Sequence, residues 1–259
     1  MNVDRKIKNI GSPRLLNDCK ADISFDNVGF SYDNQKPLFE DFNLFIPFGT
    51  SIGIVGDTGS GKTTIAKLLL RLYDIDKGKI TIGETPLDTI DISFLRKRIG
   101  IVNQSPFLFN ASIKDNIGYG LKNLTMDQIE HAANQSQATE FIEKLPSGFN
   151  TTIGERGQML SGGQQQRIAI ARTVVRNPDI IIFDEATSSV DNKTEQLIQK
   201  ALFNIQKGRT SIIIAHRLST IRNCNTIFLI KDGKVVEKGN HESLVNDGNS
   251  YYSQLWDIQ

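Results

Sequence analysis

The sequence is poor in cysteine and in long apolar runs, and each shortage excludes a class of protein. Cys19 and Cys224 stand far apart and without metal-ligand spacing, so we expect neither a disulfide framework nor a cysteine metal site. Two free thiols are typical of a reducing compartment. No apolar run approaches the roughly 18 residues that cross a bilayer. The charged start, residues 1–8, has no apolar stretch behind it, and we therefore expect no secretory signal.

An excess of charge of either sign is also missing. The 259 residues include 30 Lys and Arg against 29 Asp and Glu, for a formal net charge of +1. This balance argues against the broad electropositive surface of nucleic-acid-binding proteins, so we expect no nucleic-acid partner. Apolar content of 39% and charged content of 23% are ordinary for a globular chain. Because no apolar run is long enough to cross a bilayer, a membrane role would need another domain or chain.

Strand-like and helix-like segments alternate along the chain, which predicts an α/β core with a parallel sheet. Residues 1–20 are polar and irregular and predict a linker, and residues 21–47 alternate as strands do. Further strands are predicted over residues 51–55, 79–82, 99–102, 180–183, 211–214, 227–230 and 234–237, the last two joined by a turn at Asp232-Gly233. Helices are predicted over residues 63–73, 126–136, 138–145, from the 161–163 loop to about residue 176, and 192–206. Residues 103–178 thus form an inserted helical lobe.

A glycine-rich loop at residues 56–63 matches G-x-x-x-x-G-K-[ST], after a predicted strand and before a predicted helix. Its glycines let backbone N–H groups turn toward phosphate oxygens. Lys62 supplies a charge for the β- and γ-phosphates, and the Thr63 hydroxyl is a ligand for Mg²⁺. Asp57 is an acid inside an anion-binding loop, and we expect its carboxylate to point away from the phosphates. The predicted nucleotide site comprises Gly56, Asp57, Thr58, Gly59, Ser60, Gly61, Lys62, Thr63 and Thr64.

The apolar run Ile180–Phe183 ends in two acids, Asp184 and Glu185. A strand would carry Asp184 to the phosphate end of the sheet, where its carboxylate is a candidate ligand for Mg²⁺ through water. Glu185 is then placed to orient and deprotonate an attacking water. Buried strands that end in acids are common, so this pair indicates function only together with the phosphate loop.

A second candidate anion cradle begins at Ser161, about a hundred residues after the first. Ser161 is a good helix N-cap, which alone would explain its presence. Gly162 and Gly163 expose backbone N–H groups at the positive end of the predicted helix. One nucleotide needs one main cradle, so the second favours a site that is shared between two molecules.

These motifs together resemble the ABC ATPase family, the nucleotide-binding domains of ABC transporters. Residues 160–164, Leu-Ser-Gly-Gly-Gln, resemble the family signature, and the motifs occur in family order over residues 21–259. The resemblance implies a P-loop NTPase core with a mainly parallel sheet and an N-terminal antiparallel β subdomain, over residues 21–102 and 179–259. It also implies that residues 103–178 are the helical subdomain and that ATP and Mg²⁺ are bound.

Further site residues follow from the resemblance alone. Tyr32 resembles the aromatic that stacks on adenine, although strand packing would also account for it. Gln104 resembles the Q-loop glutamine that touches Mg²⁺ and the attacking water, and His216 resembles the switch histidine that contacts the γ-phosphate. Residues 188–191, Ser-Ser-Val-Asp, resemble the D-loop. The family more often has Ala-Leu at the two middle positions, and Asp191 is kept. Gln164 and Asp191 are implied to lie at the nucleotide with Ser161, Gly162 and Gly163.

Residues 154–157, Gly-Glu-Arg-Gly, resemble the X-loop of exporters that fuse membrane and ATPase domains. The resemblance implies an ATP-hydrolysing domain at the cytoplasmic face of the cell membrane, with residues 1–20 as a linker from a preceding transmembrane domain. Its partners would be a transmembrane domain, fused or separate, and a second ATPase domain, identical or not, that closes head to tail on ATP. The resemblance also implies that the transmembrane domain selects the cargo.

Other functions fit the residues less well than export does. Chromosome-maintenance and repair members of the family carry long coiled coils between phosphate loop and signature, and no heptads occur here. Translation-associated members usually carry two cassettes, and this chain has one. A regulator that binds ATP without hydrolysing it is disfavoured by Glu185 and His216. A P-loop kinase would leave the signature at 160–164 without a role.

Overall fold

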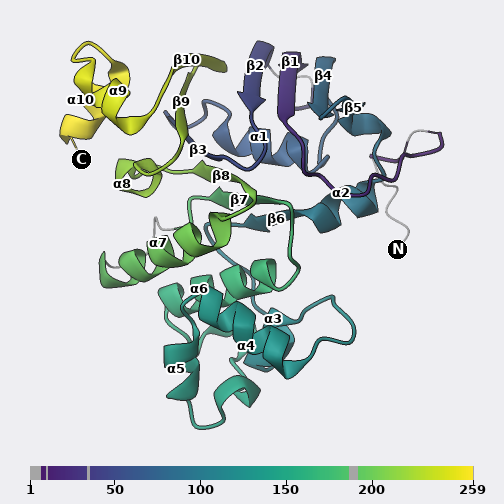
Figure 1. Cartoon of the computed structure of the whole chain (residues 1–259), viewed down its shortest axis with the longest axis vertical. Coiled ribbons are helices and arrows are strands. Elements are labelled where there is room, and N and C mark those ends of the chain that lie inside the picture. Colours follow the sequence, from purple (N-terminus) through teal and green to yellow (C-terminus); the bar gives the residue numbers. More distant parts are fainter. Residues whose placement is uncertain (1–6, 10, 34–35, 187–191, 259) are drawn as a thin grey trace.

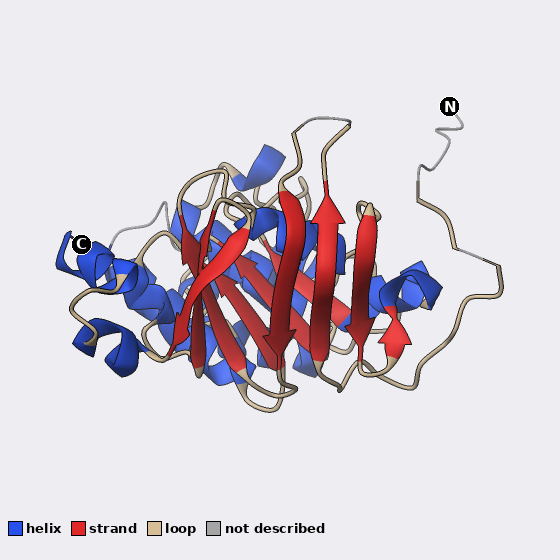
Figure 2. Ribbon diagram, turned by 90° about the horizontal axis from the view of Figure 1, so that it is seen from above, coloured by secondary structure: helices blue, strands red, loops and turns tan. Residues whose placement is uncertain are grey.

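The computed structural model describes residues 7–9, 11–33, 36–186 and 192–258. The strands in these ranges form two sheets (Figures 1 and 2). The four-stranded antiparallel sheet has the order β2-β1-β4-β5, and the six-stranded sheet has the order β10-β9-β3-β8-β7-β6. The first contains β1 (Ile23–Phe30), β2 (Phe39–Ile46), β4 (Lys77–Ile82) and β5 (Thr85–Pro86). The second contains β3 (Ser51–Gly56), β6 (Ile99–Val102), β7 (Ile180–Asp184), β8 (Thr210–Ile214), β9 (Thr226–Lys231) and β10 (Lys234–Gly239).

The six-stranded sheet is parallel except at its β10 edge. β3 pairs in parallel with both β8 and β9, and β7 pairs in parallel with β8 and β6. β9 and β10 form the predicted hairpin, in which Asp232 and Gly233 both have positive φ, at 49° and 70°. This is the backbone that a two-residue turn of the favoured kind requires. The predicted α/β class with a mainly parallel sheet is confirmed.

The two faces of this sheet belong to two different hydrophobic cores. Side chains alternate between the faces of a strand, so Ile180 and Ile182 pack in one core while Ile181 and Phe183 pack in the other. The first core also holds β1, β2 and the helix after β3; the second holds the helical lobe and the C-terminal helices. Burial on both faces explains why these strands read as continuous apolar runs.

The helices divide in the same way. α1 (Lys62–Leu69) and α2 (Ile92–Arg98) pack with the antiparallel sheet. Residues 103–178, all of them described, include α3 (Ile113–Ile117), α4 (Met126–Gln135), α5 (Thr139–Glu143) and α6 (Gly162–Val174), which lie together as a helical lobe to one side of the sheets (Figure 1). The chain ends in α7 (Asn192–Gln206), α8 (Leu218–Ile221), α9 (His241–Asn246) and α10 (Tyr251–Ile258). Within the described ranges, none of these helices has the length and apolarity to cross a membrane.

The helix predicted over residues 63–73 is too long at its C-terminal end. α1 ends at Leu69, and Arg71 has φ of 46°. Arg96 donates hydrogen bonds to the carbonyls of Leu70 and Arg71, at 2.9 and 2.6 Å, and so satisfies groups that a longer helix would use. The short helices α2, α3 and α8 were not predicted, because four to seven residues show too little of the helical period.

Residues 11–20 contain no helix or strand, yet they are attached to the core. Arg14 forms an isolated parallel bridge with Ile90, and the backbone N–H of Cys19 donates to Asp179 at 3.0 Å. Both cysteines are free and buried, and burial raises the pKa of each thiol to about 12. Neither thiol is therefore activated toward oxidation or metal binding.

The absence of a side chain at Gly53 in β3 lets α8 pack against the sheet. A Cβ at this position would lie 2.7 Å from the branched Cβ of Ile221. We predict that Gly53→Ala destabilises the protein, because overpacking costs about 1–3 kcal/mol and outweighs the gain of about 0.5–1 kcal/mol from removing a strand glycine. Urea unfolding measures the change. The control is Gly248→Ala, since a Cβ there meets nothing within 4 Å; equal midpoints for the two variants would contradict the packing of α8 on β3.

Candidate active site

The parallel strands bring four predicted site segments to one edge of the sheet. The P-loop (residues 56–63) follows β3, Glu185 follows β7, His216 follows β8 and Gln104 follows β6. These strands are mutually parallel neighbours, with Phe183 paired to Val102 and Asp184 paired to Ile214. The carboxyl edge of a parallel sheet is where ligands bind in such folds. Residues separated by up to 160 positions in the sequence therefore converge.

Two glycines of the P-loop stand where no other residue fits. Gly56 has φ of 152°, and a Cβ there would lie 2.0 Å from the carbonyl oxygen of Ile230. Gly61 has φ of 103°, and a Cβ there would lie 2.5 Å from the Phe39 ring. The loop therefore passes close to β9 and β2, and a glycine-rich loop of this kind can turn backbone amides toward an anion. Buried Ser60 Oγ has no hydrogen-bond partner in the described structure, which fits a ligand at this loop.

Lys62 is buried, at 5% exposure, and its side chain folds over the loop. Its Nζ donates to the carbonyl oxygens of Gly56 and Asp57, both at 2.8 Å. Burial lowers the pKa of Lys62, and the nearby carboxylates of Glu185, Asp57 and Asp184 oppose this shift. A cation held against the loop and close to acids is suited to phosphate oxygens.

Thr63 and Asp184, two candidate oxygen ligands for a metal, are in direct contact. The Thr63 hydroxyl donates to Asp184 Oδ1 at 3.1 Å. Burial raises the pKa of Asp184 and the Glu185 charge adds to it, while the Thr63 hydrogen bond and Lys67 and Lys62 act in the opposite direction. No cluster of three or more His, Cys, Asp or Glu that would hold a metal by itself occurs among the described residues. The donor set fits Mg²⁺, which takes one or two protein oxygens together with water and phosphate.

Glu185 and His216 are in direct contact. His216 Nε2 lies 2.7 Å from Glu185 Oε1, with side chains that are 44% and 17% exposed. Glu185 has φ of 54°, an uncommon conformation for a residue other than glycine, and its backbone N–H donates to Ile214 at 2.8 Å. Such backbone conformations cluster at functional sites. The arrangement places a carboxylate, oriented by an imidazole, beside the Thr63–Asp184 pair.

Tyr32 lies against α1, where it contacts Thr64, the first residue after the P-loop. Its hydroxyl and the Thr64 hydroxyl are 2.9 Å apart. The ring packs edge-on against Phe30 and Tyr73, and Lys67 Nζ lies 5.4 Å from its centroid. Strand and helix packing thus positions the ring beside the loop, while its stacking on adenine stays a prediction.

The Asp57 carboxylate has a partner that the sequence did not reveal. Asp57 Oδ1 accepts a hydrogen bond of 3.1 Å from the Tyr251 hydroxyl at the start of α10. This bond and the Asp57 charge raise the pKa of Tyr251. Glu237 accepts from the backbone N–H groups of Tyr251 and Tyr252, at 2.5 and 3.0 Å, and fixes the first turn of α10. The contact directs the Asp57 carboxylate toward the C-terminal helix α10. Because the two residues are 194 positions apart, no local sequence pattern indicates this hydrogen bond.

The signature, residues 160–164, lies at the start of α6. Ser161 and Gln164 form a capping box, with Gln164 N donating to Ser161 Oγ at 3.3 Å and Ser161 N donating to Gln164 Oε1 at 2.9 Å. A Cβ on Gly162 would meet nothing within 4 Å, whereas one on Gly163 would lie 2.0 Å from Thr194 Cγ2. α6 and α1 pack in different cores, on opposite faces of the sheet. The two predicted cradles are therefore held by separate parts of the molecule.

Two predicted site residues remain to be located, Gln104 and Asp191. Gln104 is exposed in the loop after β6, where Gln166 of α6 donates to the carbonyl of Asn103 at 3.1 Å. The structure thus brings Gln104 to the sheet edge beside the helical lobe. Asp191 and the rest of the predicted D-loop, residues 187–191, lie outside the described residues.

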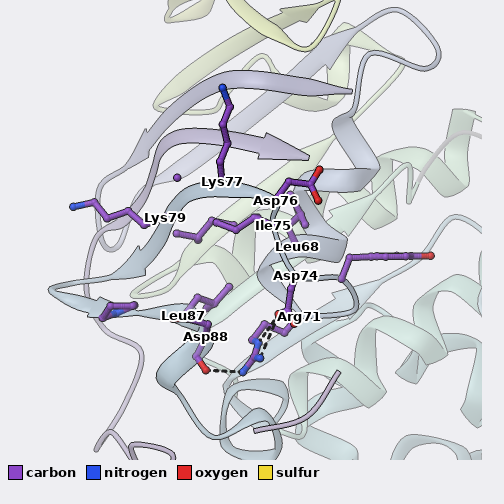
Figure 3. A pocket seen from close by; sticks show the side chains of 13 residues that line it. Leu68, Arg71, Asp74, Ile75, Asp76, Lys77, Lys79, Leu87 and Asp88 are labelled. Carbon is purple, nitrogen blue, oxygen red and sulfur yellow. Dashed lines mark hydrogen bonds and ion pairs between the residues drawn. The ribbon is translucent and has the colours of Figure 1, made fainter. Parts of the chain in front are cut away.

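A separate pocket opens between the end of α1 and strands β4 and β5 (Figure 3). The buried Arg71 guanidinium donates to the Asp88 carbonyl at 2.9 Å and pairs with Asp74 at 3.3 Å. None of the described site residues lines this pocket. Its central charge is already paired, so the pocket is not the predicted site.

Comparisons with known proteins show which family this chain resembles. A family model described as "ABC transporter" matches residues 39–188. "Multidrug resistance protein pgp-1" of Caenorhabditis elegans is 48% identical over 235 residues, covering 90% of this chain and 18% of the relative. "ABC transporter B family member 21" of Arabidopsis thaliana is 44% identical over 248 residues, covering 95% of this chain and 19% of the relative.

A solved structure extends the likeness to the whole fold. The "Structure of a bacterial Atm1-family ABC exporter with ATP bound" aligns with a TM-score of 0.92 and 38% identity, over 100% of this chain and 45% of that one. The chain thus spans under a fifth of the length of the two curated relatives and under half of the solved exporter chain. Because the family model covers more than half of its residues and the fold agrees throughout, the chain belongs to the ABC transporter family and is a nucleotide-binding domain of the exporter type.

Proposed function

We propose that this chain binds Mg-ATP at the P-loop, hydrolyses it, and drives export of a substrate across a membrane. The observation that carries the proposal is the convergence of Lys62, the Thr63–Asp184 pair and the Glu185–His216 pair at one sheet edge. Phosphoryl transfer needs a phosphate cradle, oxygen ligands for a metal and a group that orients the nucleophile. Each of these has a candidate here.

In binding, Lys62 exchanges its hydrogen bonds to the Gly56 and Asp57 carbonyls for β- and γ-phosphate oxygens. The backbone amides of residues 56–63 and the positive end of α1 hold the phosphates. Tyr32, already placed at Thr64, stacks on adenine. Thr63 and Asp184, with Gln104 as a further ligand, hold Mg²⁺. When bound there, the ion neutralises charge on the transferring phosphoryl group.

In hydrolysis, Glu185 takes a proton from a water whose oxygen bonds to the γ-phosphorus. The bond from that phosphorus to the bridging oxygen breaks, leaving ADP and phosphate. His216 orients the Glu185 carboxylate through the 2.7 Å contact and reaches the γ-phosphate. The Glu185 side chain is 17% exposed, so the carboxylate has little freedom to turn away from the water that it orients.

The signature supports a site shared between two copies. Ser161 and Gly162 are exposed at the N-terminus of α6, and the space around Gly162 is open. In the proposed head-to-tail dimer, the Ser161 hydroxyl and the amides of Gly162 and Gly163 of one copy meet the γ-phosphate bound by its partner. The partner is a second ATPase domain, identical or not, with Gln164 and Asp191 at the shared interface.

The exporter assignment supplies the remaining partner. We propose that residues 21–102 and 179–259 are the catalytic core, that residues 103–178 are the helical subdomain, and that residues 1–20 link to a transmembrane domain at the cytoplasmic face of the membrane. The support is the X-loop-like segment 154–157 together with relatives described as exporters or multidrug resistance proteins. Closure and opening of the dimer then drive the transmembrane domain between its two orientations.

We predict that Glu185→Gln lowers ATP turnover by roughly 10²–10⁴-fold, the contribution expected of a general base. Phosphate release under saturating Mg-ATP measures turnover, and a fluorescent nucleotide checks that binding persists. Glu143→Gln, which alters an exposed acid of α5, is the control and should leave turnover unchanged. Near-normal turnover of Glu185→Gln would remove Glu185 from the mechanism.

The shared site predicts that Glu185→Gln forms a dimer of twice 28.9 kDa in Mg-ATP, by light scattering. Adding Gly162→Leu should keep the protein monomeric, because a side chain there finds open space in its own chain and stands where the partner's nucleotide would lie. Leucine is also a better helix residue than glycine, so the fold should persist and ATP should still bind. A dimer that forms equally well with Gly162→Leu would exclude the signature from the interface.

The proposed role in export predicts the mass of the native polypeptide and its location in a membrane. An antibody to this domain should detect, in membranes of the source cells, a polypeptide of at least twice 28.9 kDa. A membrane-bound band of 28.9 kDa would instead indicate a separate ATPase subunit. A band of that size found only in the soluble fraction would contradict the transport function.

A further inference from the structure

Glu195 is a buried acid that none of the recognised motifs explains. It lies in the first turn of α7 and is 8% exposed. Ionised carboxylates are rarely buried unless they are paired. The N-terminal end of a helix favours negative charge, but that effect does not require burial. A specific partner therefore accounts for its position.

That partner belongs to the segment that carries the candidate catalytic histidine. Arg217 Nη1 forms an ion pair with Glu195 Oε2, and Ser219 Oγ lies 3.4 Å from Glu195 Oε1. Gln199 of α7 donates to the same Oε1 at 3.1 Å. We call residues 216–219 the switch segment. Glu195 thus contacts the switch segment at two side chains, one of them directly after His216.

The switch segment lies between two well-anchored parts of the chain. Before it, the Ala215 backbone N–H donates to Ile54 at 3.2 Å, at the end of the sheet ladder. Its C-terminal part is held in the core, because Leu218 and, beyond the segment, Ile221 of α8 are fully buried. His216 and Arg217 themselves are 44% and 40% exposed at their side chains. A side-chain anchor at Arg217 therefore acts where the backbone leaves the sheet.

The other end of this anchor is itself fixed. Thr194, which precedes Glu195, packs so closely on Gly163 of α6 that a Cβ there would lie 2.0 Å from Thr194 Cγ2. Deeper in α7, Ile198 and Leu202 are buried in the core that contains α6. The first turn of α7, which carries Glu195, is therefore fixed by packing against α6, and neither helix belongs to the switch segment.

We propose that Glu195 and Arg217 are positioning residues for hydrolysis: their ion pair holds the switch segment so that His216 Nε2 stays within hydrogen-bond distance of Glu185 Oε1. The inference rests on the proposed ATPase function and adds two residues that no motif assigned to it. Neither residue touches the nucleotide in this scheme. Each acts only through His216.

The proposal predicts a selective loss of turnover. Arg217→Met keeps the length of the side chain and removes its charge, and we expect turnover to fall about 10- to 100-fold, as small misplacements of catalytic groups cause. Arg217→Lys retains the charge and should recover most of the activity. ATP affinity should remain within a few-fold in both, because the P-loop and Tyr32 are untouched. Lys200→Met, at an exposed cation of α7, is the matched control and should match wild type.

The deciding experiment measures the same change in a second background. If Arg217 and Glu195 act through His216, then Arg217→Met and Glu195→Gln should each lower turnover in wild type and have no further effect in His216→Ala. A purely structural pair would lower turnover by the same factor in both backgrounds, and that result would overturn the proposal. Circular dichroism and ATP affinity confirm folding; if Glu195→Gln fails to fold, the half-exposed Arg217→Met decides alone.

The outcomes also separate this proposal from the proposed function. If wild type has no ATPase activity, or His216→Ala retains full activity, the catalytic assignment fails and the positioning role fails with it. If His216→Ala is impaired and Arg217→Met multiplies that loss, or if Arg217→Met turns over normally, only the positioning role fails.

Discussion

Parallel pairing of β6, β7, β8 and β3, buried on both faces, is the constraint on which the rest of the structure depends. Parallel strands end at the same edge, so the register that pairs Phe183 with Val102 and Asp184 with Ile214 also sets the separation of the functional loops. A slip of one residue would exchange the side chains that face the two cores. Because both faces are filled with isoleucine and phenylalanine, such a slip would misplace a packed surface on each side. Packing energy thereby fixes where the Thr63–Asp184 and Glu185–His216 contacts form.

The same two-sided burial separates the two anion cradles. α1 leaves the P-loop and packs with the antiparallel sheet, while α6 leaves the signature and packs in the helical lobe. A helix N-terminus attracts anions only within its first turn, so each cradle acts where its own core holds it. Two cradles held by different cores both have a use if each binds a different nucleotide. This division is the physical basis for proposing a dimer, and the open space at Gly162 is consistent with it.

Elements with a strong local pattern were predictable from the sequence, and elements set by distant contacts were not. The buried strands, the Asp232-Gly233 hairpin and the start of α4, where Thr125 and Gln128 form a capping box, follow from patterns within a few residues. The end of α1 does not, because Arg96, 25 or more residues away, binds the carbonyls that would continue the helix. The P-loop, Asp184 and Glu185 were predicted as site residues from sequence motifs and His216 from the family resemblance, but the Glu185–His216 contact needed the sheet order. Tyr251, which binds Asp57, and Arg217, which pairs with Glu195, carry no sequence signal because their partners are 194 and 22 residues away.

The first turn of α7 joins parts of the molecule that the proposed dimer would assign to different nucleotides. Thr194 packs on Gly163 of the signature helix, and the next residue, Glu195, pairs with Arg217 beside His216. In that dimer the signature of a chain contacts the nucleotide of its partner, whereas His216 serves the nucleotide of its own chain. A shift of α6 would therefore press on Thr194 and move Glu195 in the same turn, because a helix turn is rigid and the cores around it are close-packed. In the proposed dimer, adjacent residues of one helix would thus give a short, contiguous route between the two sites, without requiring any long-range path.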